Sequence, residues 1–69
     1  MIGLEAATEK AMTFLSGRGI SFIRLKEVNL KGERWIITYE DSLPFVSQRE
    51  KYIIELSRET GEVIAFRRE

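Results

Sequence analysis

The residues that could do chemistry in this chain are few, because the sequence contains neither cysteine nor histidine. That absence removes most pairs of a nucleophile with a base. No nucleophile-elbow motif surrounds the serines at element ends and in loops, which are Ser16, Ser42, Ser47 and Ser57. The adjacent carboxylates Glu40 and Asp41 could bind a cation or act as an acid–base pair, but they also suit a strand end that enters an aspartate-capped turn. We therefore expect no enzyme, no cofactor and no metal site.

Aromatic and basic side chains give a second candidate chemistry, which is binding to nucleic acid or another anion. Trp35, Tyr39 and Tyr52 could stack on bases, as aromatic side chains do in single-strand binders. Phosphate contacts could come from arginines, namely Arg24, Arg34, Arg67 and Arg68. The parity of Trp35 and Tyr39 instead favours burial under a helix, and the arginines then pair with acidic residues across strands, namely Glu27, Glu40 and Glu55. Anion binding is thus the alternative to the main prediction.

Length and charge restrict the class of protein further. The chain has 69 residues with 11 basic and 11 acidic side chains, so we expect one domain with zero formal net charge. Nucleic-acid binders usually carry a basic excess. Residues 1–5 lack the pattern of a signal peptide, and no apolar run approaches the roughly 18 residues that span a bilayer. A cytoplasmic protein without a membrane partner is expected.

Composition also bears on stability. Charged residues make up 32% of the chain, while Asn29 is the only asparagine and Gln48 the only glutamine. This balance is typical of heat-adapted proteins. A domain of this size has a small core, and without cysteine it forms no disulfide, so we expect tight packing or self-association to supply the missing stability.

The elements that must position these residues follow from the apolar pattern. Residues 2–16 repeat apolar side chains at helical spacing and end at a glycine-rich stop, which predicts an N-terminal helix. Strands are predicted over residues 20–30, 34–40, 51–56 and 62–67. The apolar parity changes between Leu25 and Val28, which indicates a bulge. The expected fold is α+β, a helix packed on a four-stranded antiparallel meander in the order 1-2-3-4.

The last two strands decide which side chains the helix covers. Gly61 closes a four-residue loop, so Leu56 should face Val63 and Ile54 should face Ala65. That register predicts a core face of Tyr52, Ile54, Leu56, Val63 and Ala65. The opposite face then carries an apolar cluster that we predict to bind a partner, consisting of Ile36, Ile53, Ile64 and Phe66. The alternative is that the loop 41–50 folds over this cluster.

Several of these features together resemble the PepSY family of small domains. The shared pattern is a helix with alanines on its apolar face, Trp35 and Tyr52 opening two strands, and the hairpin Glu59–Val63. The resemblance implies a PepSY-like or cystatin-like fold and a role in peptidase inhibition or regulation. The chain is also similar to the gas vesicle protein O family in the order of its marker residues, which are Trp35, Glu40, Pro44, Tyr52, Gly61, Phe66 and Arg67-Arg68.

The most economical prediction is a small, non-catalytic protein-interaction or regulatory module. Its partner is expected to be another protein or a second copy of the chain.

Overall fold

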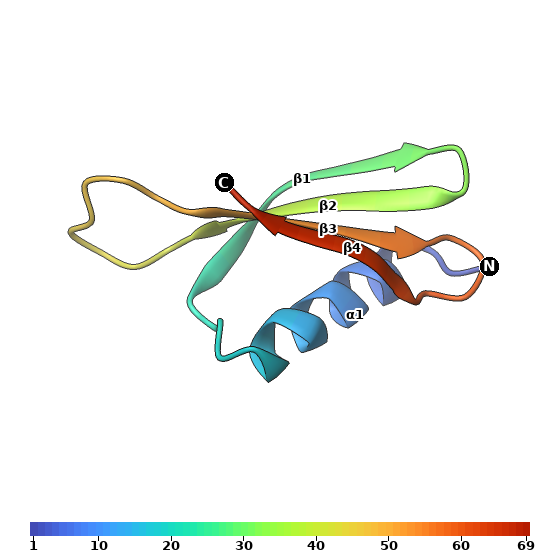
Figure 1. The fold of residues 1–69 in the computed structure, drawn as a ribbon, viewed down its shortest axis with the longest axis horizontal. Coiled ribbons are helices and arrows are strands. Elements are labelled where there is room, and N and C mark those ends of the chain that lie inside the picture. The colour runs from blue at the N-terminus through green and yellow to red at the C-terminus, as the bar shows by residue number, and fades with distance from the viewer.

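The computed structural model describes residues 1–69 and contains one helix packed on a four-stranded antiparallel sheet (Figure 1). Helix α1 spans Leu4–Gly17, and the strands follow it as β1 (Ile23–Lys31), β2 (Arg34–Asp41), β3 (Lys51–Ser57) and β4 (Val63–Arg68). The strands lie side by side in the order β1-β2-β3-β4. The predicted α+β meander is therefore confirmed.

Helix α1 is amphipathic, and its ends follow local chemistry. Glu5 lies in the first turn, where negative charge suits the positive end of the helix dipole. After the last turn, the backbone N–H of Arg18 donates to the Leu15 carbonyl, and Gly19 has a φ of 79° that reverses the chain. The helix is not long and apolar enough to cross a membrane.

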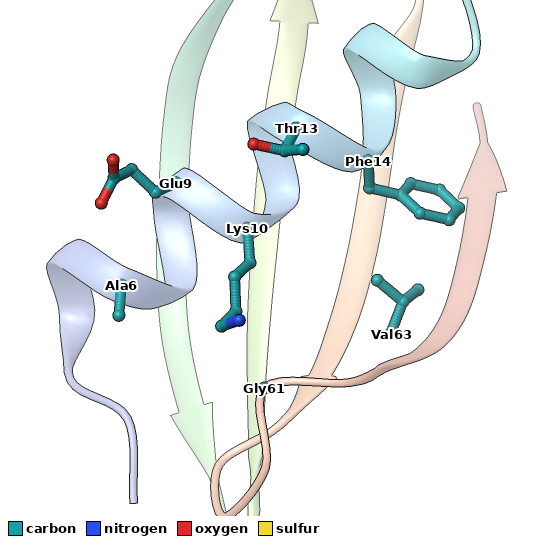
Figure 2. A pocket seen from close by; sticks show the side chains of 7 residues that line it. All are labelled: Ala6, Glu9, Lys10, Thr13, Phe14, Gly61 and Val63. Carbon is teal, nitrogen blue, oxygen red and sulfur yellow. The ribbon is translucent and has the colours of Figure 1, made fainter.

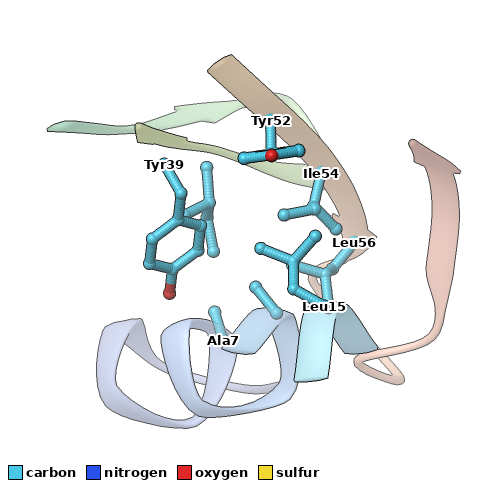
Figure 3. Packing of buried hydrophobic residues seen from close by; sticks show 8 residues of the cluster. Ala7, Leu15, Tyr39, Tyr52, Ile54 and Leu56 are labelled. Atoms are coloured by element: carbon cyan, nitrogen blue, oxygen red, sulfur yellow. The ribbon is translucent and has the colours of Figure 1, made fainter. Parts of the chain in front are cut away.

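The core lies between α1 and the middle strands (Figure 3). Two small residues on the helix, Ala7 and Ala11, are fully buried and let the helix approach the sheet closely. The remaining buried side chains of this cluster are Leu15, Ile37, Tyr39, Tyr52, Ile54 and Leu56. Tyr39 Oη donates to the Thr8 carbonyl at 2.9 Å and Trp35 Nε1 to the Ile2 carbonyl at 3.1 Å. The expectation that Trp35 and Tyr39 face the helix is confirmed.

The predicted bulge in β1 is also present. Leu25 pairs with Tyr39 and Glu27 with Thr38, so Lys26 is the extra residue. The shift brings Val28 opposite Ile37 on the helix side of the sheet. Leu25 and Val28 therefore share one face although they are three positions apart in the sequence.

The register predicted for β3 and β4 is wrong beyond its first pair. Leu56 pairs with Val63 as expected, but Glu55 pairs with Ala65 and Ile54 with Phe66. Ile64 is the extra residue of a second bulge. Phe66 therefore lies on the helix side, where its ring contacts Phe14 edge-on at 5.3 Å, and Ala65, predicted in the core, is exposed. A phenyl ring gains far more from burial than a methyl group, which favours the bulged register.

Candidate functional site

The four residues predicted to bind a partner do not form one surface. Ile36 and Ile53 lie on neighbouring strands of the face that α1 does not cover, here called the open face. Ile64 is 45% exposed at the β4 bulge, and Phe66 lies on the opposite face of the sheet. Ile53 is only 7% exposed although no helix lies over it. The predicted apolar patch is therefore neither contiguous nor widely exposed.

Charged side chains of the chain itself cover the open face. Glu55 faces Ile36 across the sheet, accepts a hydrogen bond from Arg34 at 3.0 Å and forms an ion pair with Arg67 at 3.5 Å. Arg67 in turn is the cross-strand neighbour of Ile53. Long arginine side chains cover apolar surface with their stems while their guanidinium groups stay in water. These ion-paired side chains therefore shield the apolar residues of the open face from water, as a second layer of helices or strands does in other sheets.

The two adjacent carboxylates serve the structure in different ways. Arg24 Nη2 donates to Glu40 Oε1 at 2.8 Å, and this hydrogen bond holds the pKa of Glu40 below its usual range. Asp41 Oδ1 accepts from the backbone N–H of Leu43 at 2.9 Å, which caps the turn after β2 as its sequence suggested. No cluster of acidic side chains is arranged to hold a metal ion.

The four arginines of the anion-binding alternative each have an acidic partner. Arg24 pairs with Glu40, and Arg34 and Arg67 share Glu55. Arg68 lies 3.5 Å from a carboxylate oxygen of Glu50, and its guanidinium group stacks over the Tyr52 ring at 5.3 Å. A carboxylate therefore already engages each of the four, so the geometry does not favour anion binding by these arginines.

Neither the pocket beside α1 nor the loop 42–50 presents a set of catalytic side chains. A shallow pocket of about 490 Å³ lies between α1 and the β3–β4 hairpin, with the Lys10 side chain over Gly61 (Figure 2). It contains no nucleophile paired with a base. The loop 42–50 extends away from the sheet (Figure 1). Phe45 in this loop is fully exposed. Phe45 therefore does not cover the open face, which is contrary to the alternative that the loop 41–50 folds over the apolar cluster.

An uncovered apolar area that sequence reasoning missed lies on the helix side of β1. Leu25 is 49% exposed and Leu30 42%, and Val28 between them is half-buried. These three residues are called here the β1 surface. Met12, 50% exposed, lies on the flank of α1 away from Phe14, because residues two positions apart in a helix point about 200° apart.

A signal for this surface was present in the sequence. Four strands at a spacing of about 4.8 Å make a sheet wider than one helix, whose diameter is about 10 Å. A single helix thus leaves one edge of such a sheet uncovered. The apolar residues after the β1 bulge identify which edge has side chains that need cover.

Comparison of the chain with known protein families, with curated proteins and with solved structures gives no match. The resemblances to the PepSY and gas vesicle protein O families stay predictions from sequence, and function has to be argued from the surfaces themselves.

Proposed function

We propose that this chain is a small, non-catalytic protein-interaction module that binds its partner through β1. The observation that carries this function is the coincidence of two features on one strand. β1 ends the sheet, so one side of its backbone pairs with no other strand. Beside that free edge lie the exposed side chains of the β1 surface. A partner strand added to such an edge gains main-chain hydrogen bonds and apolar contacts together.

The other edge of the sheet is less suited to a partner. β4 ends in Arg67 and Arg68, which are held in ion pairs with Glu55 and Glu50. Both charges are therefore already engaged within the chain, unlike Glu27 and Lys31 of β1, which form no ion pair. On its helix side, β4 also places Phe66 against Phe14 and Arg18, so this side chain is already used within the chain.

The proposed module acts without catalysis. Glu40 is held ionised by Arg24, and Asp41 is engaged in its turn, so neither carboxylate is free for acid–base work. A cytoplasmic location and adaptation to heat, both expected from the sequence, belong to the same proposal. Regulation of a peptidase, which the PepSY resemblance implies, is one role that such a module could serve.

The test compares partner retention by the wild type with retention by two surface variants. Leu30→Glu places a charge on the β1 surface, and Ile64→Glu places the same charge at an equally exposed position away from it. Each protein is immobilised, exposed to extract of the native host, and its bound proteins are identified by mass spectrometry.

Proteins retained by the wild type and by Ile64→Glu, but lost from Leu30→Glu, would support the proposed function. A set of retained proteins that Leu30→Glu leaves unchanged would contradict it. If the bound proteins were lost only from Ile64→Glu, the partner would bind at Ile64, which belongs to the cluster predicted from the sequence, and not at β1.

A further inference from the structure

We propose that the partner is a second copy of this chain, paired antiparallel along β1 about a two-fold axis that passes through Asn29. This inference deepens the proposed function and depends on it, because it uses the same strand edge and the same β1 surface.

The bulge in β1 limits the register of such a pairing. From Glu27 to Lys31 the strand pairs with β2 without interruption, and Lys26 interrupts it just before. Asn29 is the midpoint of this five-residue segment. Two copies that use the whole segment therefore place Asn29 opposite itself, Val28 opposite Leu30, and Glu27 opposite Lys31. Such an axis, perpendicular to the sheet, keeps both helices on one side of a continuous eight-stranded sheet.

The charges of β1 suit this register. Glu27 faces Thr38 and Lys31 faces Arg34 across the sheet, so both point to the open face. In the dimer each Glu27 would face a Lys31 of the other copy, and symmetry would make two such pairs. Within the single chain, Glu27 accepts only from Asn29 Nδ2 at 2.6 Å, and Lys31 takes part in none of the ion pairs. Both charges are thus free to bind a second copy, and neutral Asn29 at the axis meets itself without repulsion.

The apolar side of β1 suits the same register. Val28 and Leu30 share the helix side of the sheet, and the pairing places each against the other residue of the second copy. Leu30, 42% exposed in the single chain, would lose part of that exposure in the dimer. The formal net charge of zero adds no overall repulsion between copies.

Charge reversal in trans tests the register. Wild type, Glu27→Lys, Lys31→Glu and an equimolar mixture of the two variants are compared by sedimentation equilibrium. A contact this small should give the wild type a dissociation constant on the order of tens of micromolar. Each variant alone should associate about tenfold or more weakly, because two attractive pairs become repulsive. The mixture should recover the wild-type constant, since every cross-copy pair is then glutamate against lysine.

A covalent test of the same register uses the absence of native cysteine. Residues directly opposite in an antiparallel pair have Cα atoms about 4.5–5.5 Å apart, which a disulfide can bridge. Mild oxidation should therefore link Asn29→Cys into a dimer. Lys31→Cys is the matched control and should stay unlinked, because its copies would lie about 14 Å apart along the strand. Melting curves for every variant check that the fold is intact.

Three results would overturn the two-fold pairing: a wild type that stays monomeric at about 1 mM, a mixture no tighter than its components, or equal cross-linking by both cysteine variants. If any of these occurs while Leu30→Glu still removes proteins retained from host extract, the second copy is the wrong partner and the proposed function stands. If Leu30→Glu also changes nothing, both fail.

Discussion

One isoleucine and one leucine show how the two faces of this sheet differ. On the open face Ile53 lies under no second layer, yet only 7% of it is exposed. On the helix side Leu30 belongs to the face that α1 covers, yet 42% of it is exposed. Leu30 is thus more exposed than Ile53 although the helix lies on its side of the sheet, because α1 packs mainly against β2 and β3.

The difference lies in what covers each side chain. Arg34 and Arg67 reach Glu55 from two strands of the open face, where Glu55 is the cross-strand neighbour of Ile36 and Arg67 that of Ile53. β1 has no comparable bridge on its helix side, where its side chains are apolar. Apolar exposure in a small sheet therefore depends on local cover by single side chains as much as on which face bears the helix.

The largest expected effect comes from the core under the helix. Ile54→Ala removes a side chain with no exposed surface and should cost about 2–5 kcal/mol of the free energy of unfolding. Ile53→Ala, its neighbour on the open face, should cost only about 1–2 kcal/mol, because flexible charged side chains can settle into the space. Urea denaturation of both variants measures the contrast. Equal losses would show that the ion pairs cover Ile53 as firmly as the helix covers Ile54.

A smaller loss is expected where the β3–β4 hairpin meets α1. Gly61 has a φ of 80°, and a Cβ there would lie 2.7 Å from Cδ and Cε of Lys10. The Lys10 side chain can move away, so the backbone conformation sets the cost, and Gly61→Ala should destabilise by about 1–2 kcal/mol. Gly17→Ala, with no atom within 4 Å of the added Cβ, is the control and should be neutral or stabilising in thermal melts. If Gly61→Ala left the stability unchanged, the backbone of the hairpin would have to accommodate the added Cβ without strain.

The open-face ion pairs should contribute less than either. Glu55→Gln leaves the shape nearly unchanged but removes the charge that Arg34 and Arg67 share. The expected loss is about 0.5–1 kcal/mol, because partly exposed ion pairs are weak. The loss should shrink in high salt, which screens such pairs. A loss that salt does not change would mean that Glu55 acts through packing.

The smallest effect is a change in the pH dependence of stability. The Arg24 hydrogen bond lowers the pKa of Glu40 in the folded chain, so its contribution is present above the ordinary pKa of glutamate and is lost as the pH falls toward the lowered value. Glu40→Gln and Arg24→Gln should each flatten the acid side of a plot of melting temperature against pH. Wild-type slopes in both variants would contradict this role for the pair.

The sequence predicted the parts of this fold that repeat clearly. The helix pattern, the strand order and the bulge between Leu25 and Val28 all depend on local periodicity, and the structure confirms them. Of the three acidic residues expected to pair with arginines across strands, Glu40 and Glu55 do so, whereas Glu27 forms no ion pair.

The site could not be predicted in the same way. Residues 63–66 are Val-Ile-Ala-Phe, four apolar residues in a row, so their alternation gives no parity and the bulge at Ile64 was invisible. That one-residue shift places Phe66 on the helix side of the sheet, so the residues predicted to bind a partner do not share one face. The β1 surface was overlooked for a different reason. Its exposure depends on the width of the sheet relative to the diameter of the helix, and the apolar pattern of the sequence does not report that width.

The central claim is that β1 is an interaction surface while the open face is closed by its own charges. Backbone and methyl NMR spectra of the wild type recorded from about 10 µM to 1 mM test it most directly, since that range brackets the expected dissociation constant. We predict concentration-dependent shifts in the amides of residues 27–31 and in the methyl groups of Val28 and Leu30, with the methyl groups of Ile36 and Ile53 unchanged. Shifts confined to Ile36 and Ile53 would contradict the claim for both surfaces, and no shifts in β1 over the whole range would rule out pairing with a second copy.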